Sequence, residues 1–276
     1  MRHLLKAAVS GALLAPVLML AATPGLGQGL GTQFPDDTPQ QRQAPPEPEF
    51  VPPPRNADGR VELGPPEGET GLWVGRGGLN VTSHDEVPYQ PWALEVRDYR
   101  RSSPLEPHTR CKPSGGPRQW LTPYGAEIVE IPKDEMVYIF DIGGPHTYRQ
   151  IYMDGRAHPE DFAPTYYGHS VGRWEGDTLV IDSVGYNERF WMDRGQSPHT
   201  EDLHMIERLT RNGLNDMTYE ITVDDPNVYT EPWTAELQMN WTGDRELFEY
   251  VCQDNNFATD IMVGVEDDVD RLWIIP

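Results

Sequence analysis

The chain has 276 residues, and its 22 Lys and Arg against 44 Asp and Glu give a formal net charge of −22. So acidic a protein repels phosphate groups, which excludes nucleic acid and anionic membranes as expected partners. The simplest interpretation of the charge is that it keeps an exported protein in solution.

The first 27 residues have the pattern of a secretory signal peptide. Arg2 and Lys6 make a positive start, and residues 7–22 are largely apolar. This stretch is too short and too interrupted for a membrane span, which needs roughly 20 apolar residues. Small residues near Gly27 place the expected cleavage after it. We therefore expect a periplasmic or secreted protein with no membrane span.

Two cysteines, Cys111 and Cys252, follow the expected cleavage site. Outside the cytoplasm an even pair most simply forms one disulfide. Two reduced, buried thiols are the alternative. A zinc site is disfavoured, because cysteines so far apart match no zinc motif.

Two segments come before the region of regular strands. Residues 28–66 are dense in Pro, Gln, Gly and acidic residues, so they bury too little apolar surface to offset the entropy of ordering. We expect a disordered or extended leader there, removable without unfolding the core. Residues 67–123 should form an irregular segment packed on the body, with one short helix near residues 92–99.

From residue 124 to residue 276, short runs rich in Val, Ile, Tyr and Thr alternate with turn sequences. The turns contain pairs such as Gly143-Gly144 and Asn212-Gly213, which tolerate the positive φ of tight hairpins. The runs are residues 126–131, 136–142, 147–153, 171–174, 178–184, 203–211, 216–223, 234–241 and 246–252. About eight hairpin-linked strands predict a mainly β, antiparallel, up-and-down barrel-like fold that can hold one small ligand. A β-sandwich is the alternative.

One inward position carries a carboxylate. In residues 203–211 the apolar face contains Leu203, Met205 and Leu209, and the same alternation points Glu207 inward. A buried carboxylate needs a partner or a raised pKa, and Arg149 is a plausible inward partner. Glu207 is therefore either half of a structural ion pair or a site carboxylate for acid–base chemistry.

The densest polar stretch, residues 191–204, is expected at a mouth of the barrel, where binding groups collect. It supplies His199, held by Asp193 or Glu201, as a second proton-transfer group beside Glu207. In this hypothesis Arg149 orients an anionic or carbonyl oxygen of the substrate.

Further histidines and aromatic residues are candidate ligand contacts: His146, His204, Tyr148, Tyr152, Trp191 and Trp233. Aromatic walls beside a carboxylate and a histidine suit an aromatic, terpenoid or sugar-like ligand. Several histidines with one carboxylate would also suit a divalent metal, but no HxH or HExxH spacing is present. Metal and cofactor content therefore stay undetermined.

Several strings between residues 111 and 264 together resemble a widespread family of exported bacterial proteins. They are YIFDIGGPH (138–146), YMDGR (152–156), GRWEGDTLV (172–180), PH (198–199), DDP (224–226) and EYVC (249–252). The resemblance implies export and a compact β-rich domain. No activity is established for that family, so the resemblance carries over no reaction and no catalytic residue.

The leading hypothesis is an exported small-molecule-binding protein that performs acid–base chemistry such as hydration, elimination, isomerisation or hydrolysis. The alternatives are a non-catalytic carrier of a hydrophobic or aromatic ligand and a structural envelope protein. An enzyme should bring Glu207, a histidine and open volume together, whereas a carrier should keep Glu207 salt-bridged and dry.

Overall fold

The computed structural model describes residues 50–66, 68–102, 106–143, 147–250 and 252. The expected signal peptide, residues 28–49 of the expected leader and the candidate ligand contact His146 lie outside the described residues. Within the described ranges, no helix is long and apolar enough to cross a membrane.

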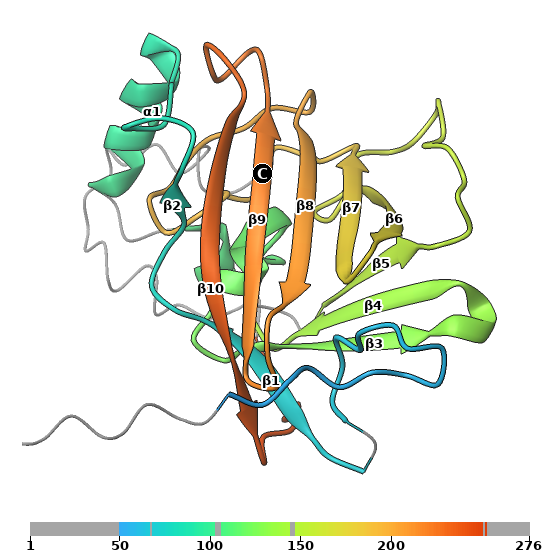
Figure 1. Ribbon diagram of the computed structural model, residues 1–276. Coiled ribbons are helices and arrows are strands. Elements are labelled where there is room, and N and C mark those ends of the chain that lie inside the picture. The colour runs from blue at the N-terminus through green and yellow to red at the C-terminus, as the bar shows by residue number, and fades with distance from the viewer. Residues whose placement is uncertain (1–49, 67, 103–105, 144–146, 251, 253–276) are drawn as a thin grey trace, which may run out of the picture. The chain divides into compact units, whose positions relative to one another are not determined.

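The strands of the described residues form one sheet, most of which closes into a barrel (Figure 1). They are β1 (Gly71–Gly75), β2 (Asn80–Val81), β3 (Ala126–Ile131), β4 (Met136–Asp141), β5 (Tyr148–Tyr152), β6 (His169–Glu175), β7 (Thr178–Val184), β8 (His204–Arg211), β9 (Asp216–Asp224) and β10 (Trp233–Gly243). Strands β3 to β10 are neighbours in chain order, and β1 closes the ring by pairing with both β3 and β10. The short strand β2 adds to the edge of β10. The predicted barrel-like fold is confirmed, and the sandwich alternative is wrong.

The predicted strand at residues 246–252 is wrong, since residues 246–250 contain no strand. A hairpin after β10 would place that run along the edge of β10 opposite β9. That edge is already occupied by β1, whose pairs with β10 run from Gly71 with Gly243 to Gly75 with Met239. Strands β1 and β2 lie in the segment expected to be irregular.

The side chains that line the inside of the barrel are packed against one another. On β9 the inward side chains are Met217, Tyr219, Ile221 and Val223, all at 0% exposure. The 3-10 helix η2 (Gly116–Leu121) is buried along its whole length. Its Trp120 ring lies 5.9 Å from the ring of Tyr219, so η2 occupies space inside the barrel.

The junction of β5 and β6 departs from the up-and-down pattern. These two strands are parallel, and only Ile151 and Tyr152 of β5 pair with β6. The connection between them, residues 153–168, must return to the starting end of the barrel, as parallel pairing requires. It forms the long excursion beside β5 and β6 in Figure 1. The first half of β5 is therefore unpaired on its β6 side.

Residues 50–66, which we call the N-terminal strap, pack on the barrel, contrary to the expected disordered leader. Val61 and Leu63 of the strap are fully buried. The guanidinium of Arg211, at the end of β8, donates to the carbonyl oxygens of Glu62 at 2.7 Å and Gly64 at 2.9 Å. Although its composition is poor in apolar residues, the strap is ordered by these few buried groups and by polar contacts to its backbone.

Besides η2, the described residues contain one α-helix and two short 3-10 turns. Helix α1 (Pro91–Arg101) confirms the short helix expected near residues 92–99. Proline at its first turn and two arginines in its last turn suit a helix start and the negative end of the helix dipole. Two further 3-10 turns are η1 (Pro107–Arg110) and η3 (Pro132–Asp134).

The expected disulfide is confirmed. Cys111 follows η1, and Cys252 lies beyond β10. The two sulfur atoms are bonded, with the Cα atoms 5.5 Å apart. The bond fastens the segment after β10 to the segment between α1 and η2.

Candidate functional site

A buried ion pair crosses the interior of the barrel. Arg149 of β5 donates from Nη1 to Oε1 of Glu207 on β8 at 2.9 Å and from Nη2 to Oε2. The hydroxyl of Tyr219 on β9 also donates to Oε1, at 2.8 Å. Nε of Arg149 donates to the hydroxyl of Ser170 at 3.0 Å, and Nη2 also donates to the hydroxyl of Ser183 at 2.7 Å. Each polar atom of the pair therefore has a partner, as buried charges require.

The Arg149–Glu207 pair is shielded from solvent. Glu207 is 0% exposed and Arg149 is 1% exposed, so no water-sized space adjoins the carboxylate. Burial alone would lower the pKa of Arg149, but the carboxylate of Glu207 outweighs burial and raises that pKa above its ordinary value. The expected inward orientation of Glu207 and its pairing with Arg149 are confirmed. The geometry favours the structural interpretation of the pair over a site carboxylate.

The second expected proton-transfer group, His199, does not join Glu207. Its Nε2 lies 3.0 Å from the carbonyl oxygen of Phe190, and its Nδ1 lies 3.3 Å from that of Thr200. Asp193, expected to hold His199, instead accepts from the backbone and hydroxyl of Ser197 at 3.0 and 2.8 Å. Burial lowers the pKa of His199 to about 4, because no anion compensates for the lost hydration. Among the described residues neither Asp193 nor Glu201 bonds to His199, so the expected pairing of His199 with one of these carboxylates is wrong.

Two candidate ligand contacts are core residues. Trp191 is 3% exposed and lies under the guanidinium of Arg100, which is 5.0 Å from its ring centroid. Trp233 is 1% exposed and packs edge-on against Tyr229, with 5.5 Å between ring centroids. Neither has surface to offer a ligand in this structure.

An open pocket of about 350 Å³ lies where β5 and β6 separate, on the outer side of the wall; we call it the outer pocket. Its aromatic walls and one histidine come from β5, from the 153–168 connection and from the start of β6: Tyr148, Tyr152, Phe162, Tyr166, Tyr167 and His169. Two of the expected ligand contacts, Tyr148 and Tyr152, thus line one pocket. Tyr148 is 55% exposed, so it can cover a ligand.

The local backbone that forms the outer pocket depends on Gly168. Its φ is +62°, a conformation that side chains with a Cβ rarely adopt. A Cβ there would also lie 2.4 Å from the carbonyl oxygen of Val184. Glycine therefore lets the chain turn sharply from the 153–168 connection into His169.

His169 begins a line of hydrogen-bonded side chains on the outer face of the barrel. Its Nδ1 lies 2.8 Å from Nδ1 of His158 in the 153–168 connection. Nε2 of His158 lies 3.2 Å from Oδ1 of Asp182 on β7. Nε2 of His204, an expected ligand contact on β8, lies 2.8 Å from the same oxygen. We call His169, His158, Asp182 and His204 the histidine relay.

The His169 ring is held by aromatic packing as well as by hydrogen bonds. It is nearly parallel to the ring of Tyr152, with 5.0 Å between ring centroids, and Phe162 contacts its edge at 5.7 Å. Burial and the nearby His158 and Arg156 lower the pKa of His169 below its ordinary value. A neutral, fixed imidazole therefore borders the outer pocket.

A second titratable group lies behind the outer pocket. The hydroxyl of Tyr167 donates to Oδ2 of Asp141 at 2.6 Å, and Thr147 lies 2.8 Å from the same hydroxyl. Burial raises the pKa of Asp141 to about 7, although the hydrogen bond from Tyr167 opposes this shift. Asp141 reaches the pocket only through Tyr167.

The described residues contain no group of three or more His, Cys, Asp or Glu side chains arranged to hold a metal ion. In the histidine relay, the ring nitrogens bond to one another and to one carboxylate oxygen. These four side chains are therefore joined in one chain of hydrogen bonds.

The sequence interpretation missed His158 and Asp182 as site residues. Alternation within 178–184 places Asp182 on the outer face, but β7 and β8 are joined by the long segment 185–203. No tight turn fixes their register, so the contact between Asp182 and His204 has no local signal. His158 lies in a long connection, whose conformation depends on distant contacts.

Comparison of the chain with protein families, with curated proteins and with solved structures finds no match. The resemblance stated above therefore stays an expectation, and the candidate site rests on its own geometry.

Proposed function

We propose that this protein acts outside the cytoplasm, in the periplasm or as a secreted protein, and binds a small planar molecule in the outer pocket. The proposal rests on one observation: aromatic side chains surround about 350 Å³ at a break in the barrel wall, beside one fixed histidine. Ligand sites are typically concave, mostly apolar and aromatic, with a few placed polar groups.

One polar group of the outer pocket, the imidazole of His169, indicates the kind of ligand. Nε2 of His169 bonds to no other described residue, and in a neutral imidazole one nitrogen accepts a hydrogen bond. A planar ring that carries a hydroxyl fits this site, because the ring can stack on tyrosines while the hydroxyl donates to His169.

The proposal leaves Glu207 and His199 out of the site. Glu207 has no exposed surface, and His199 is bound to backbone carbonyls. The carrier hypothesis and the acid–base hypothesis both survive in altered form, with the ligand in the outer wall instead of the lumen.

Binding of 4-nitrophenol, measured by calorimetry and by its absorbance, tests the proposal. Tyr148→Ala removes an exposed wall of the pocket and should weaken binding about tenfold, equivalent to about 1.4 kcal/mol. Tyr99→Ala, on helix α1, removes an equally exposed tyrosine (48% against 55%) and should leave binding unchanged. Equal affinities of wild type, Tyr148→Ala and Tyr99→Ala would place the ligand elsewhere.

A further inference from the structure

We infer that His169 is a general base toward a hydroxyl of the bound molecule, that His158 accepts a proton from His169 in turn, and that Asp182 positions both histidines. The inference deepens the proposed function and rests on it. It turns the outer pocket from a binding site into a site of proton transfer.

The hydrogen bonds of the relay determine where the protons lie. Asp182 is a carboxylate, so His158 Nε2 must carry the hydrogen that points at Oδ1, 3.2 Å away. A neutral His158 then has only a lone pair on Nδ1. The contact of 2.8 Å between the two Nδ1 atoms therefore requires His169 to donate. This leaves the lone pair of His169 on Nε2.

The opposite arrangement of protons is unfavourable. If His158 donated from Nδ1 while neutral, its Nε2 lone pair would face the carboxylate of Asp182 across 3.2 Å. Two acceptors at that separation repel each other. The tautomer of His169 is thus set by a carboxylate two hydrogen bonds away, as an orienting group sets the base in other proton-transfer sites.

The transfer step balances in atoms and charge. The O–H bond of the ligand breaks, its proton bonds to Nε2 of His169, and the electron pair stays on the ligand oxygen. The Nδ1 proton of His169 then passes to Nδ1 of His158. The resulting imidazolium of His158 donates from Nε2 to Asp182, so the new positive charge ends beside a negative one.

Other charged groups face the two histidines, and their electrostatic effects on the histidines partly cancel. Arg156 lies on the 153–168 connection and disfavours a positive charge on His169, whereas Asp154 favours it. His204 donates to the same oxygen of Asp182 from β8 at 2.8 Å. Among these groups, only Asp182 bonds directly to His158 and is negative.

Phenols are the substrate class that fits the inference. A phenolic ring stacks on the tyrosines of the outer pocket, and an electron-withdrawing substituent such as a nitro group makes its hydroxyl acidic enough for an imidazole to deprotonate. The absorbance of 4-nitrophenol reports both binding and ionisation, so the two events can be measured separately in one sample.

The experiment compares the ionisation of bound 4-nitrophenol in the full-length wild type and in Asp182→Asn. The absorbance is measured one pH unit below the pKa of free 4-nitrophenol. Proton transfer into the relay should raise the acid dissociation constant of the bound phenol about tenfold in the wild type, because the imidazolium that it creates stabilises the phenolate. In Asp182→Asn this increase should disappear while the affinity for the neutral ether 4-nitroanisole stays unchanged. Asp182 is 33% exposed, so the variant should fold.

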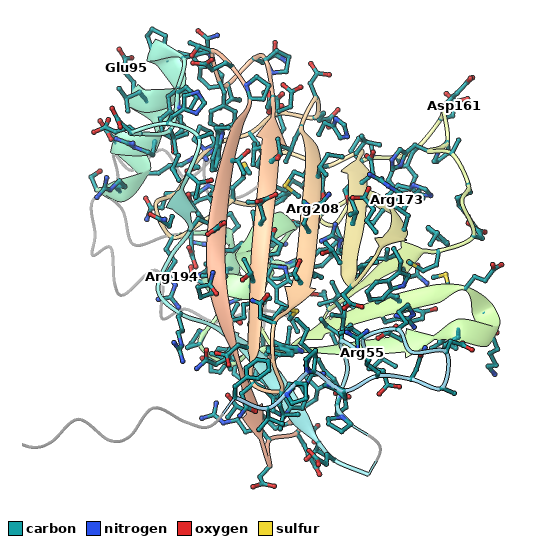
Figure 2. The ribbon with its side chains drawn as sticks, viewed as in Figure 1. Arg55, Glu95, Asp161, Arg173, Arg194 and Arg208 are labelled. Carbon is teal, nitrogen blue, oxygen red and sulfur yellow. A yellow bond between two sulfur atoms is a disulfide. The ribbon has the colours of Figure 1, made fainter. Side chains whose placement is uncertain are left out.

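Asp161→Asn is the matched control. This variant makes the same chemical change at an exposed residue near the tip of the 153–168 connection, where Figure 2 labels Asp161. It should keep the tenfold increase. Equal acidity of the bound phenol in the wild type and Asp182→Asn would overturn the relay while leaving the binding site intact.

A second measurement does not depend on phenol binding. Diethyl pyrocarbonate acylates unprotonated imidazole nitrogen, and mass spectrometry gives the rate at His169 in ligand-free protein. Asp182→Asn should lower that rate severalfold, and Asp161→Asn should not change it. If the wild type binds no 4-nitrophenol but these rates differ as expected, the proposed function fails and the relay stands. Equal rates in all three proteins would overturn the relay.

Discussion

At the scale of single residues, the pair of Arg149 and Glu207 ties β5 to β8 across the interior of the barrel. We predict that Glu207→Gln lowers the free energy of unfolding by roughly 3–5 kcal/mol, because it leaves a buried guanidinium without its counter-charge. Gln has nearly the volume of Glu, so lost packing contributes little. Urea unfolding followed by tryptophan fluorescence measures the change.

A double replacement separates the charge from the shape. Arg149→Met with Glu207→Leu should recover part of the loss, since apolar residues often replace a buried pair at little cost. Recovery stays incomplete, because the Tyr219 hydroxyl loses its acceptor. The control is Glu220→Gln, at a carboxylate 39% exposed, which should change stability by less than about 0.5 kcal/mol. A Glu207→Gln variant as stable as the wild type would contradict the structural interpretation.

His199 makes stability depend on pH. Its pKa is lowered from 6.5 to about 4, so between these values the unfolded chain binds a proton that the folded protein does not. Stability should therefore fall as the pH falls from 6.5 towards 4, by at most about 1.4 kcal/mol per pH unit. Asp141, with its raised pKa, titrates in the opposite sense. The test is the difference in unfolding free energy between wild type and His199→Gln, which should shrink on acidification; a constant difference would contradict it.

At the scale of elements, the N-terminal strap depends on Arg211, which is 2% exposed and donates to backbone carbonyl oxygens of the strap. We predict that Arg211→Met costs about 3 kcal/mol or more, because several buried carbonyls lose their donor. Arg208→Met, on the same strand but with its side chain 37% exposed (Figure 2), should change stability by less than about 0.5 kcal/mol. Chemical unfolding of both variants measures this.

Deletion tests the same element. A chain that starts at residue 67 loses Val61 and Leu63 from the core and should melt at a markedly lower temperature. A chain that keeps residues 50–66 but lacks 28–48 should melt like the wild type. Equal melting of both deletions would mean that the strap contributes nothing to folding.

The strands and connections also show which structural features local sequence can predict. Strands β8, β9 and β10 were predicted because alternation and turn residues are local signals. Glu207 was singled out because it is a charged residue on the apolar face of its strand. Three features depend on distant contacts and were missed: closure of the barrel by β1, the parallel junction of β5 and β6, and the ordered strap. The outer pocket follows from the second of these. Tyr148 and Tyr152 were predicted as ligand contacts, but the contact between His158 and His169 was not predicted.

At the scale of the whole molecule, the disulfide joins residues 141 positions apart and so constrains most of the barrel in the unfolded chain. Restricting so long a loop stabilises the folded state by about 5 kcal/mol in the chain-entropy model, and measured gains are often smaller. Such a bond forms and persists in an oxidising compartment. The stability of the barrel and the expected export of the chain are therefore linked.

This link gives a prediction for the intact protein. The full chain, recovered outside the cytoplasm of a bacterial host, should begin at Gln28 and hold Cys111 and Cys252 as a disulfide. The same chain without residues 1–27, made in a reducing cytoplasm, should hold two thiols and melt at a lower temperature until it is oxidised. Intact mass before and after alkylation reads both the first residue and the thiol count, and a Cys111→Ala, Cys252→Ala double variant controls for the bond. Recovery of the full chain in the cytoplasm with residues 1–27 still attached would contradict export, and thiols in chain collected outside the cell would contradict the disulfide.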